Sequence, residues 1–194
     1  MTAAQAKDIP DPREELVEHL PAMRAFALSL TRNRAAADDL VQDSIVKAWQ
    51  NIDKFQPGTN LRAWLFTILR NLFYSARRKS KREVQDSDGA MMATLSEKPE
   101  HDGRLAMADF ETAFAKLNVE QREALILVGA SGFSYEEAAG MCGVAMGTIK
   151  SRVNRGRARL VELLDLKEDE ALELTDKSTM AVVTARLLPN KDFV

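Results

Sequence analysis

The chain has 194 residues with a formal net charge of −2, and 45% of the residues are hydrophobic. This length and composition suit one or two domains with packed cores, and the near-neutral charge excludes a uniformly basic nucleic-acid binder. The single cysteine, Cys142, excludes an internal disulfide framework. No apolar run approaches the roughly 18 residues of a membrane span, and the N-terminus carries no basic-then-apolar signal pattern. We therefore expect a soluble cytoplasmic protein that does not enter a membrane.

Two helices open the chain. Asp11 is an acidic cap and Pro12 suits the first position of a helix that continues at helical spacing to Leu30. Pro21 interrupts this helix and is expected to kink it or to divide it in two. Asn33 can cap a second helix, from residue 34 to about residue 50. The apolar stripe predicted for the second helix comprises Leu40, Val41, Ile45, Ala48, Trp49 and Ile52.

The opposite face of the second helix is acidic. It carries Asp38, Asp39, Gln42 and Asp43. Such a face is either solvated surface or a docking face for a basic partner. The residues alone leave both interpretations open.

A third helix follows a loop at residues 55–60 and runs to about residue 82, with no acid and seven Lys or Arg. Its apolar stripe comprises Leu61, Trp64, Leu65, Ile68, Leu69 and Leu72. Its other face alternates basic and aromatic side chains, namely Arg62, Phe66, Arg70, Phe73, Arg77 and Lys81. Cations beside aromatics suit unstacked single-stranded bases, because stacking contributes about 1–3 kcal/mol per base. The alternative is that Phe66 and Phe73 fill a second core face.

A linker rich in Asp, Ser, Gly, Pro and Glu covers residues 83–104, and helical spacing then resumes. Asn118 and Gln121 predict a capping box that opens a helix ending near Gly132. Ser134 and Glu137 predict a second capping box, which opens a helix-turn-helix.

The turn of this helix-turn-helix is expected at Gly143, because it needs a residue without a Cβ atom. Ile149 and Val153 are expected to anchor the second helix on the first. That second helix carries Lys150, Arg152, Arg155, Arg157 and Arg159, with no acid between Thr148 and Leu160. Cations of one sign repel each other unless something binds them, which favours entry into a DNA major groove. The alternative is an αα-hairpin with a solvated charged face.

The sequence offers no catalytic site. His19 and His101 lie far apart, and Cys142 is expected to be a packing residue. Neither a Gly-rich phosphate loop nor a set of paired metal ligands is found. We expect a protein that is not an enzyme and needs no cofactor or metal.

The predicted fold is all-α, with two small helical domains joined by a flexible linker, the C-terminal one a helix-turn-helix. The N-terminal domain covers residues 11–82, the linker 83–104, and the C-terminal domain 105–166. An acidic tail of unknown role covers residues 167–194.

Four motifs together resemble the extracytoplasmic-function (ECF) group of bacterial RNA polymerase sigma factors, over residues 16–164. They are DDLVQD at 38–43 followed by Ala48-Trp49, NLRAWLFTILRN at 60–71, QREAL at 121–125 and GTIKSRV at 147–153. The run LVGASGFSYEEAA at 127–139 is more narrowly similar to the EcfG type, which directs the general stress response. The acidic tail departs from the pattern of the group, which usually stops soon after the recognition helix.

The resemblance implies a role for each motif. The docking residues for the clamp helices of the polymerase β′ subunit would be Asp39, Gln42, Asp43 and Trp49. Capture and melting of the −10 element would use Asn60, Arg62, Trp64, Arg70 and Asn71, with a flipped base held near the 55–60 loop. Reading of a GGAAC-like −35 element would use Lys150, Ser151, Arg152, Asn154, Arg155 and Arg157.

The implied partners are promoter DNA and core RNA polymerase, contacted at the β′ clamp helices and the β flap. The resemblance also implies inhibition by a NepR-type anti-sigma factor and its release by a PhyR-type response regulator. Two alternatives remain from the residues. One is a stand-alone helix-turn-helix regulator, and the other is a sigma-like protein that sequesters an anti-sigma factor.

Overall fold

The computed structural model describes residues 12–86 and 102–165, and every regular element in these two ranges is helical. The N-terminal elements are α1 (Pro12–Thr31), α2 (Arg34–Gln50), the short 3-10 helix η1 (Ile52–Lys54) and α3 (Leu61–Asp86). The C-terminal elements are α4 (Asp102–Ala115), α5 (Val119–Leu125), the π-helical turn η2 (Ile126–Ala130), α6 (Tyr135–Cys142) and α7 (Met146–Leu164). The all-α class and the C-terminal helix-turn-helix are confirmed.

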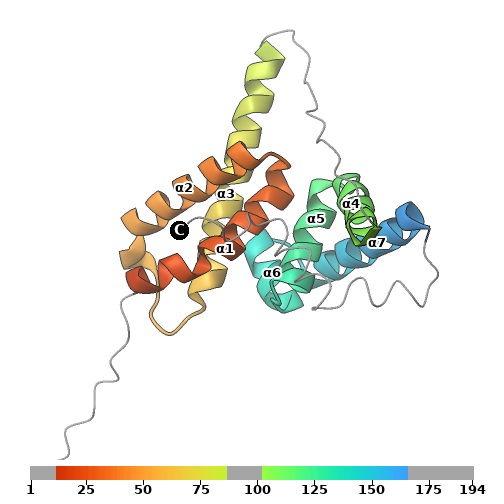
Figure 1. Cartoon of the computed structure of the whole chain (residues 1–194). Helices are drawn as coiled ribbons and strands as arrows, with labels where there is room; N and C mark the ends of the chain where they lie inside the picture. The colour runs from red at the N-terminus through yellow and green to blue at the C-terminus, as the bar shows by residue number, and fades with distance from the viewer. Residues whose placement is uncertain (1–11, 87–101, 166–194) are drawn as a thin grey trace, which may run out of the picture.

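The N-terminal and C-terminal helices lie against each other. Figure 1 shows α1–α3 on one side and α4–α7 on the other, with the last turns of α3 projecting beyond both groups. Buried residues of both groups belong to the same hydrophobic cluster in the described part of the chain. Phe66 of α3 stands near its centre, stacked on Phe26 of α1 with ring centroids 4.9 Å apart and edge-on to Phe133 at 5.3 Å.

The helix starts agree with the expected caps. Asn33 Oδ1 accepts from the amide of Ala36 at 2.9 Å, so α2 begins where the sequence places it. Both capping boxes form, Asn118 with Gln121 and Ser134 with Glu137. Each box satisfies backbone donors that a helix start leaves free.

Two helix expectations need correction. Pro21 lies inside α1, which continues through it and is not divided. The helix α3 extends past residue 82 to Asp86 and α4 begins at Asp102, so the expected linker at 83–104 overlaps a helix at both ends. Residues 87–101 and the expected tail at 167–194 lie outside the described residues, as do His101 and Asp11.

The helix-turn-helix is held by close packing at its turn and crossing. Gly143 adopts φ 64°, the left-handed conformation expected for the turn. Ile149 and Val153 are buried, 0% and 1% exposed, as the apolar spacing predicts. These contacts fix α7 on the body of the C-terminal helices and determine which of its side chains face outward.

Candidate nucleic-acid and polymerase interface

The outward side of α7 is cationic. Of the residues predicted to read the −35 element, Lys150, Ser151, Asn154 and Arg155 are exposed. Lys150 Nζ lies 5.9 Å from the centroid of the Tyr135 ring, and Arg155 Nε donates to the backbone carbonyl of Ser151 at 3.3 Å. These side chains can reach phosphates or base edges from one face of the helix.

Two of the predicted −35 residues point partly inward. Arg152 and Arg157 are only partly exposed. Arg152 Nη1 and Arg157 Nε are buried and make no hydrogen bond within the described residues. Arg159, which the sequence also places on the cationic face, forms an ion pair of 2.7 Å with Glu162. Among the cations of α7 that the structure describes, Lys150 and Arg155 are therefore the two that are exposed and not paired with an acid.

The start of α3 brings together the first of the predicted −10 residues. Asn60 caps α3, because its Oδ1 accepts from the amide of Ala63 at 3.1 Å. Its Nδ2 donates to Glu137 Oε1 of α6 at 3.0 Å. Trp64 packs against Phe55 of the preceding loop with ring centroids 5.5 Å apart, and Asn71 is exposed.

Both arginines predicted for the −10 element contact the C-terminal helices. The Arg62 guanidinium lies 5.4 Å from the centroid of Phe66 and 5.2 Å from that of Phe133, and burial lowers its pKa. Arg70 Nε forms an ion pair of 2.7 Å with Glu123 Oε1 of α5. Although burial opposes the charge of Arg70, the Glu123 carboxylate raises its pKa.

The aromatic residues of α3 do not form an exposed stacking platform. Phe66 is 0% exposed and belongs to the core, which excludes the interpretation in which it stacks on a single-stranded base. Phe73 is half-buried and lies edge-on to Tyr74, with ring centroids 5.2 Å apart. The alternative of a second core face is therefore confirmed for Phe66, because α3 is covered on more than one side.

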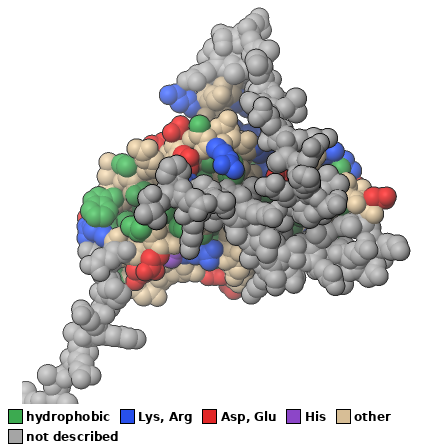
Figure 2. Space-filling view, viewed as in Figure 1, with side chains coloured by type: hydrophobic (Ala, Val, Ile, Leu, Met, Phe, Trp, Pro, Cys, Tyr) green, Lys and Arg blue, Asp and Glu red, His purple; other side chains and the backbone are tan. Residues whose placement is uncertain are grey.

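The predicted polymerase-docking residues all lie on the surface of α2. Asp39, Gln42 and Asp43 are exposed, and Trp49 is 55% exposed. The prediction that Trp49 belongs to the apolar stripe is wrong. The guanidinium of Arg13 lies 5.5 Å from the Trp49 ring centroid, which holds the indole at the surface between α1 and α2. Figure 2 shows hydrophobic side chains on the visible face of these helices, with cationic and acidic side chains beside them.

A groove joins this acidic face of α2 to the basic end of α3. It has a volume of about 720 Å³ and lies between α2 and the second half of α3. Asp39 and Asp43 line one side, and Phe73, Arg77 and Lys81 line the other. The acidic face and the basic–aromatic face, which are separate in the sequence, are thus neighbours in space.

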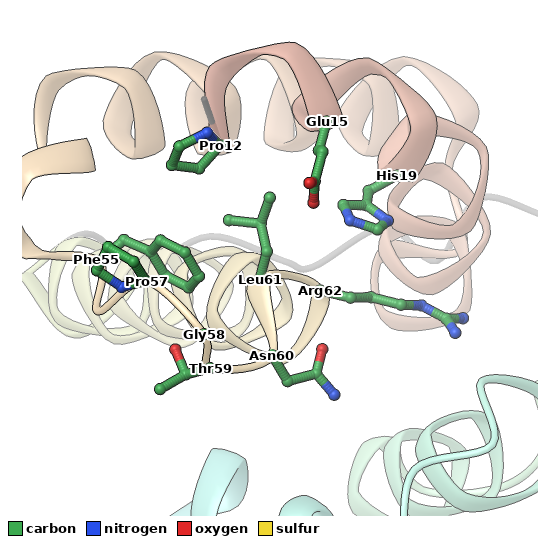
Figure 3. Close-up of a pocket in the computed structure, with 10 residues that line it drawn as sticks. All are labelled: Pro12, Glu15, His19, Phe55, Pro57, Gly58, Thr59, Asn60, Leu61 and Arg62. Carbon is green, nitrogen blue, oxygen red and sulfur yellow. The ribbon is translucent and has the colours of Figure 1, made fainter. Parts of the chain in front are cut away.

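A smaller cavity of about 370 Å³ lies between α1 and the 55–60 loop. Figure 3 shows Glu15 and His19 of α1 facing Leu61 of α3 across this cavity. Burial and the nearby Arg62 charge lower the pKa of His19, so its imidazole is neutral at pH 7. The other lining residues are Pro12, Phe55, Pro57, Gly58, Thr59, Asn60 and Arg62.

Sequence reasoning missed the residues that join the two groups of helices. Glu123, Tyr74 and Phe133 make contacts between them, and Arg122 Nε donates to the carbonyl of Ser29 in α1 at 2.8 Å. Arg122 and Glu123 belong to the 121–125 motif, which the sequence singled out without a role for them. Two adjacent charged residues in a motif were the available signal, but their partners lie far away in the sequence.

Within residues 12–86 and 102–165, no group of three or more His, Cys, Asp or Glu side chains is placed to hold a metal ion. In the same ranges no helix is both long enough and apolar enough to cross a bilayer. Cys142 is buried, which raises the pKa of its thiol to about 12. Its expected packing role fits this burial.

Both groups of helices match known families. Residues 16–83 match the family described as Sigma-70 region 2, and residues 107–160 match Sigma-70, region 4. The ECF RNA polymerase sigma factor EcfG of Rhodopseudomonas palustris is 57% identical over 152 residues, which cover 78% of this chain and 84% of that protein. The RNA polymerase sigma factor CnrH of Cupriavidus metallidurans is 30% identical, over 80% of this chain and 87% of its own length.

Two solved structures are similar to the chain. The sigma factor RpoE in complex with the anti-sigma factor NepR from Bartonella quintana is 56% identical, with a TM-score of 0.73 over 80% of this chain and 98% of that one. The PhyRSL–NepR complex from Sphingomonas sp. Fr1 has a TM-score of 0.60 at 21% identity, over 79% and 90% of the two chains, and shows the likeness of fold alone.

Proposed function

Since the chain belongs to the ECF family of RNA polymerase sigma factors, we propose that it recruits core polymerase to stress-response promoters and opens them there. The observation that supports this most directly is the exposed cationic side of α7, anchored by the buried Ile149 and Val153. The chain acts in the cytoplasm as a dissociable subunit and not as an enzyme by itself. Binding energy, rather than nucleotide hydrolysis, opens the DNA.

The C-terminal helices read the −35 element as a duplex. Lys150, Asn154 and Arg155 are exposed on one face of α7 and contact bases and phosphates in the major groove. Ser151 adds a phosphate contact. Arg152 and Arg157 are half-buried, so they contribute through the exposed part of each side chain.

The N-terminal helices capture the melted −10 element. Asn60 and Arg62 line the cavity beside the 55–60 loop, and this cavity accepts a flipped base. Trp64, Arg70 and Asn71 continue along α3 and guide the unpaired strand.

The acidic face of α2 docks on the polymerase. Asp39, Gln42 and Asp43 present carboxylates and an amide to the basic β′ clamp helices, and Trp49 is the apolar anchor beside them. The C-terminal domain, assigned to residues 105–166, contacts the β flap. The N-terminal domain extends to the end of α3 at Asp86, and residues 87–101 connect it to α4.

The likeness to RpoE bound to NepR supports regulation of the same kind. A NepR-type anti-sigma factor binds the chain and withholds it from the polymerase. A PhyR-type response regulator removes that inhibitor, so it controls the chain indirectly.

Promoter opening tests this proposal. Core polymerase, the chain and a duplex promoter with a GGAAC −35 element are combined, and unpaired thymines are detected with permanganate. We expect reactive thymines around −10 only when core polymerase and the chain are both present, and fewer of them with Asn71→Ala. Duplex binding by the chain alone, with no reactive thymines on adding core polymerase, would instead indicate a stand-alone regulator.

A further inference from the structure

One buried carboxylate joins the two groups of helices. Glu123 of α5 is 0% exposed. Its Oε1 binds Arg70 Nε at 2.7 Å, and its Oε2 accepts from the Tyr74 hydroxyl at 3.2 Å. Both partners belong to α3, so the carboxylate of one group is satisfied by donors of the other.

Further contacts surround this ion pair. Arg122, the neighbour of Glu123, donates to the Ser29 carbonyl of α1 at 2.8 Å. Phe133 lies against both the Phe66 ring and the Arg62 guanidinium. With the Asn60–Glu137 hydrogen bond of 3.0 Å, the C-terminal helices engage three residues assigned to the −10 strand: Asn60, Arg62 and Arg70.

These contacts conflict with strand binding. A single strand is held through its phosphates by free cations. The Arg70 side chain is only 16% exposed, and its charge is already neutralised by Glu123. A phosphate approaching Arg70 would also meet the Glu123 carboxylate, and like charges in a desolvated site repel strongly. Arg70 therefore cannot pair with Glu123 and bind a DNA phosphate at the same time.

A second cation, Arg152 of α7, acts on Glu123 through its charge. Burial raises the pKa of Glu123, whereas the charges of Arg70 and Arg152 act to lower it. Arg152 Nη1 is buried and donates no hydrogen bond within the described residues. When α3 separates from α5, Arg70 gains access to solvent or phosphate, and the charge of Arg152 still acts on Glu123. That remaining attraction lowers the cost of opening.

We propose that Glu123 is a switch residue, which in the free chain holds α5 against α3 and covers the −10 face until Arg70 exchanges the carboxylate for a strand phosphate. This inference rests on the proposed role of Arg70 in −10 binding. The free chain is accordingly closed, and docking on the polymerase favours the open form in which both DNA-reading faces are available.

The test measures opening and strand binding separately on the full chain. Donor and acceptor dyes are placed at Lys47→Cys on α2 and at Lys116→Cys in the turn after α4, both exposed positions. Buried Cys142, with its raised pKa, stays unlabelled. Glu123→Gln is compared with Glu111→Gln, which removes the same charge from an exposed position of α4. Strand binding is measured by the anisotropy of a labelled single-stranded −10 oligonucleotide.

We expect Glu123→Gln to lower energy transfer in the free chain and to tighten oligonucleotide binding roughly tenfold, because a buried pair that loses one charge no longer holds. Tyr74→Phe should also lower energy transfer and should tighten oligonucleotide binding about threefold, as the loss of one hydrogen bond predicts. This variant replaces Glu123→Gln in the test if Glu123→Gln does not fold. Glu111→Gln should match the unsubstituted chain in both readings.

If energy transfer is unchanged in both Glu123→Gln and Tyr74→Phe, Glu123 does not hold the free chain closed and the proposal is wrong. If energy transfer falls but oligonucleotide binding does not tighten, Arg70 does not exchange the Glu123 carboxylate for a DNA phosphate. The assignment of Arg70 to the −10 element would then also be wrong. The promoter-opening experiment above does not depend on this result, because a permanently open chain would still melt a promoter with core polymerase.

Discussion

Gly156 of α7 lies directly against Leu125 of α5. A Cβ atom at Gly156 would stand 2.9 Å from Leu125 Cδ1 and 3.3 Å from its Cγ. Leu125 is 2% exposed and has little room to move. The absence of a side chain at Gly156 thus sets how closely α7 crosses α5.

Gly156→Ala should therefore destabilise the protein. The added methyl group overpacks the crossing, which costs about 1–3 kcal/mol. Gly140→Ala is the matched control, because Gly140 lies inside α6 with nothing within 4 Å of its Cβ position. That change should raise the free energy of unfolding by about 0.4–1 kcal/mol. Chemical denaturation of both variants distinguishes the two effects, and equal stability of the two would contradict the close crossing.

Arg155→Ala should weaken binding to a duplex that carries the −35 element. Arg155 is exposed on the outer side of α7 and is bonded only to the helix backbone within the described residues. A guanidinium that reads a base contributes about 1–3 kcal/mol of discrimination. Anisotropy titrations should show this loss for the GGAAC duplex and a smaller one for a scrambled duplex.

Lys116→Ala, at an exposed position in the turn after α4, removes one cation away from α7 and controls for net charge. If Arg155→Ala and Lys116→Ala weaken both duplexes equally, Arg155 does not read a base.

Trp49→Ala should weaken the complex with core polymerase. The indole is 55% exposed beside the acidic residues of α2, and an exposed aromatic anchor is the usual centre of an interface. We expect a loss of about 2 kcal/mol, measured by competition with a labelled sigma factor for core polymerase. Gln50→Ala, on the adjacent exposed position, should change affinity little. A Trp49→Ala variant that competes as well as Gln50→Ala would remove Trp49 from the docking face.

The thiol of Cys142 should be nearly inert in the folded chain. Burial, and secondarily the charge of Glu123, raise its pKa from 9.0 to about 12. Because the thiolate is the reactive form, alkylation by iodoacetamide at pH 8 should be roughly a thousandfold slower in the folded than in the unfolded chain. A raised pKa also means that the stability due to this group is complete below pH 9 and is lost as the pH rises toward 12. Equal alkylation rates with and without denaturant would show that the thiol is accessible.

Local features of the fold follow from the sequence because they depend on neighbouring residues. The caps at Asn33, Asn118 and Ser134 and the turn at Gly143 each need only a few consecutive residues. The burial of Ile149 and Val153 follows from helical spacing. These are interactions within one or two turns of helix, and no distant partner decides them.

Positions at the edge of an apolar stripe could not be assigned in this way. Spacing left Phe66 open between a DNA-facing side and a second core face, and it is buried, whereas Trp49 was expected in the core and is exposed. Spacing gives the direction of a side chain along a helix, but which neighbouring element covers that direction depends on the tertiary fold. Phe66 is covered by Phe26 and by Phe133, which come from different parts of the chain.

The ion pair of Arg70 with Glu123 lay beyond sequence reasoning for the same reason. The partners are 53 residues apart, and the basic run of α3 offers several other arginines to any acid. Only the packing of α5 on α3 selects Arg70. The sequence thus predicts candidate surfaces for DNA and polymerase, but not the contacts that cover one of those surfaces.

Run-off transcription is the most direct measurement of the central claim. Purified core polymerase and the chain are given a template with a GGAAC −35 element, with an active sigma factor and its own promoter as the control. We predict a transcript from a defined start site, which is lost when the −35 element is scrambled and much reduced by Trp49→Ala. No start-specific transcript, while the control sigma factor remains active, would contradict the account.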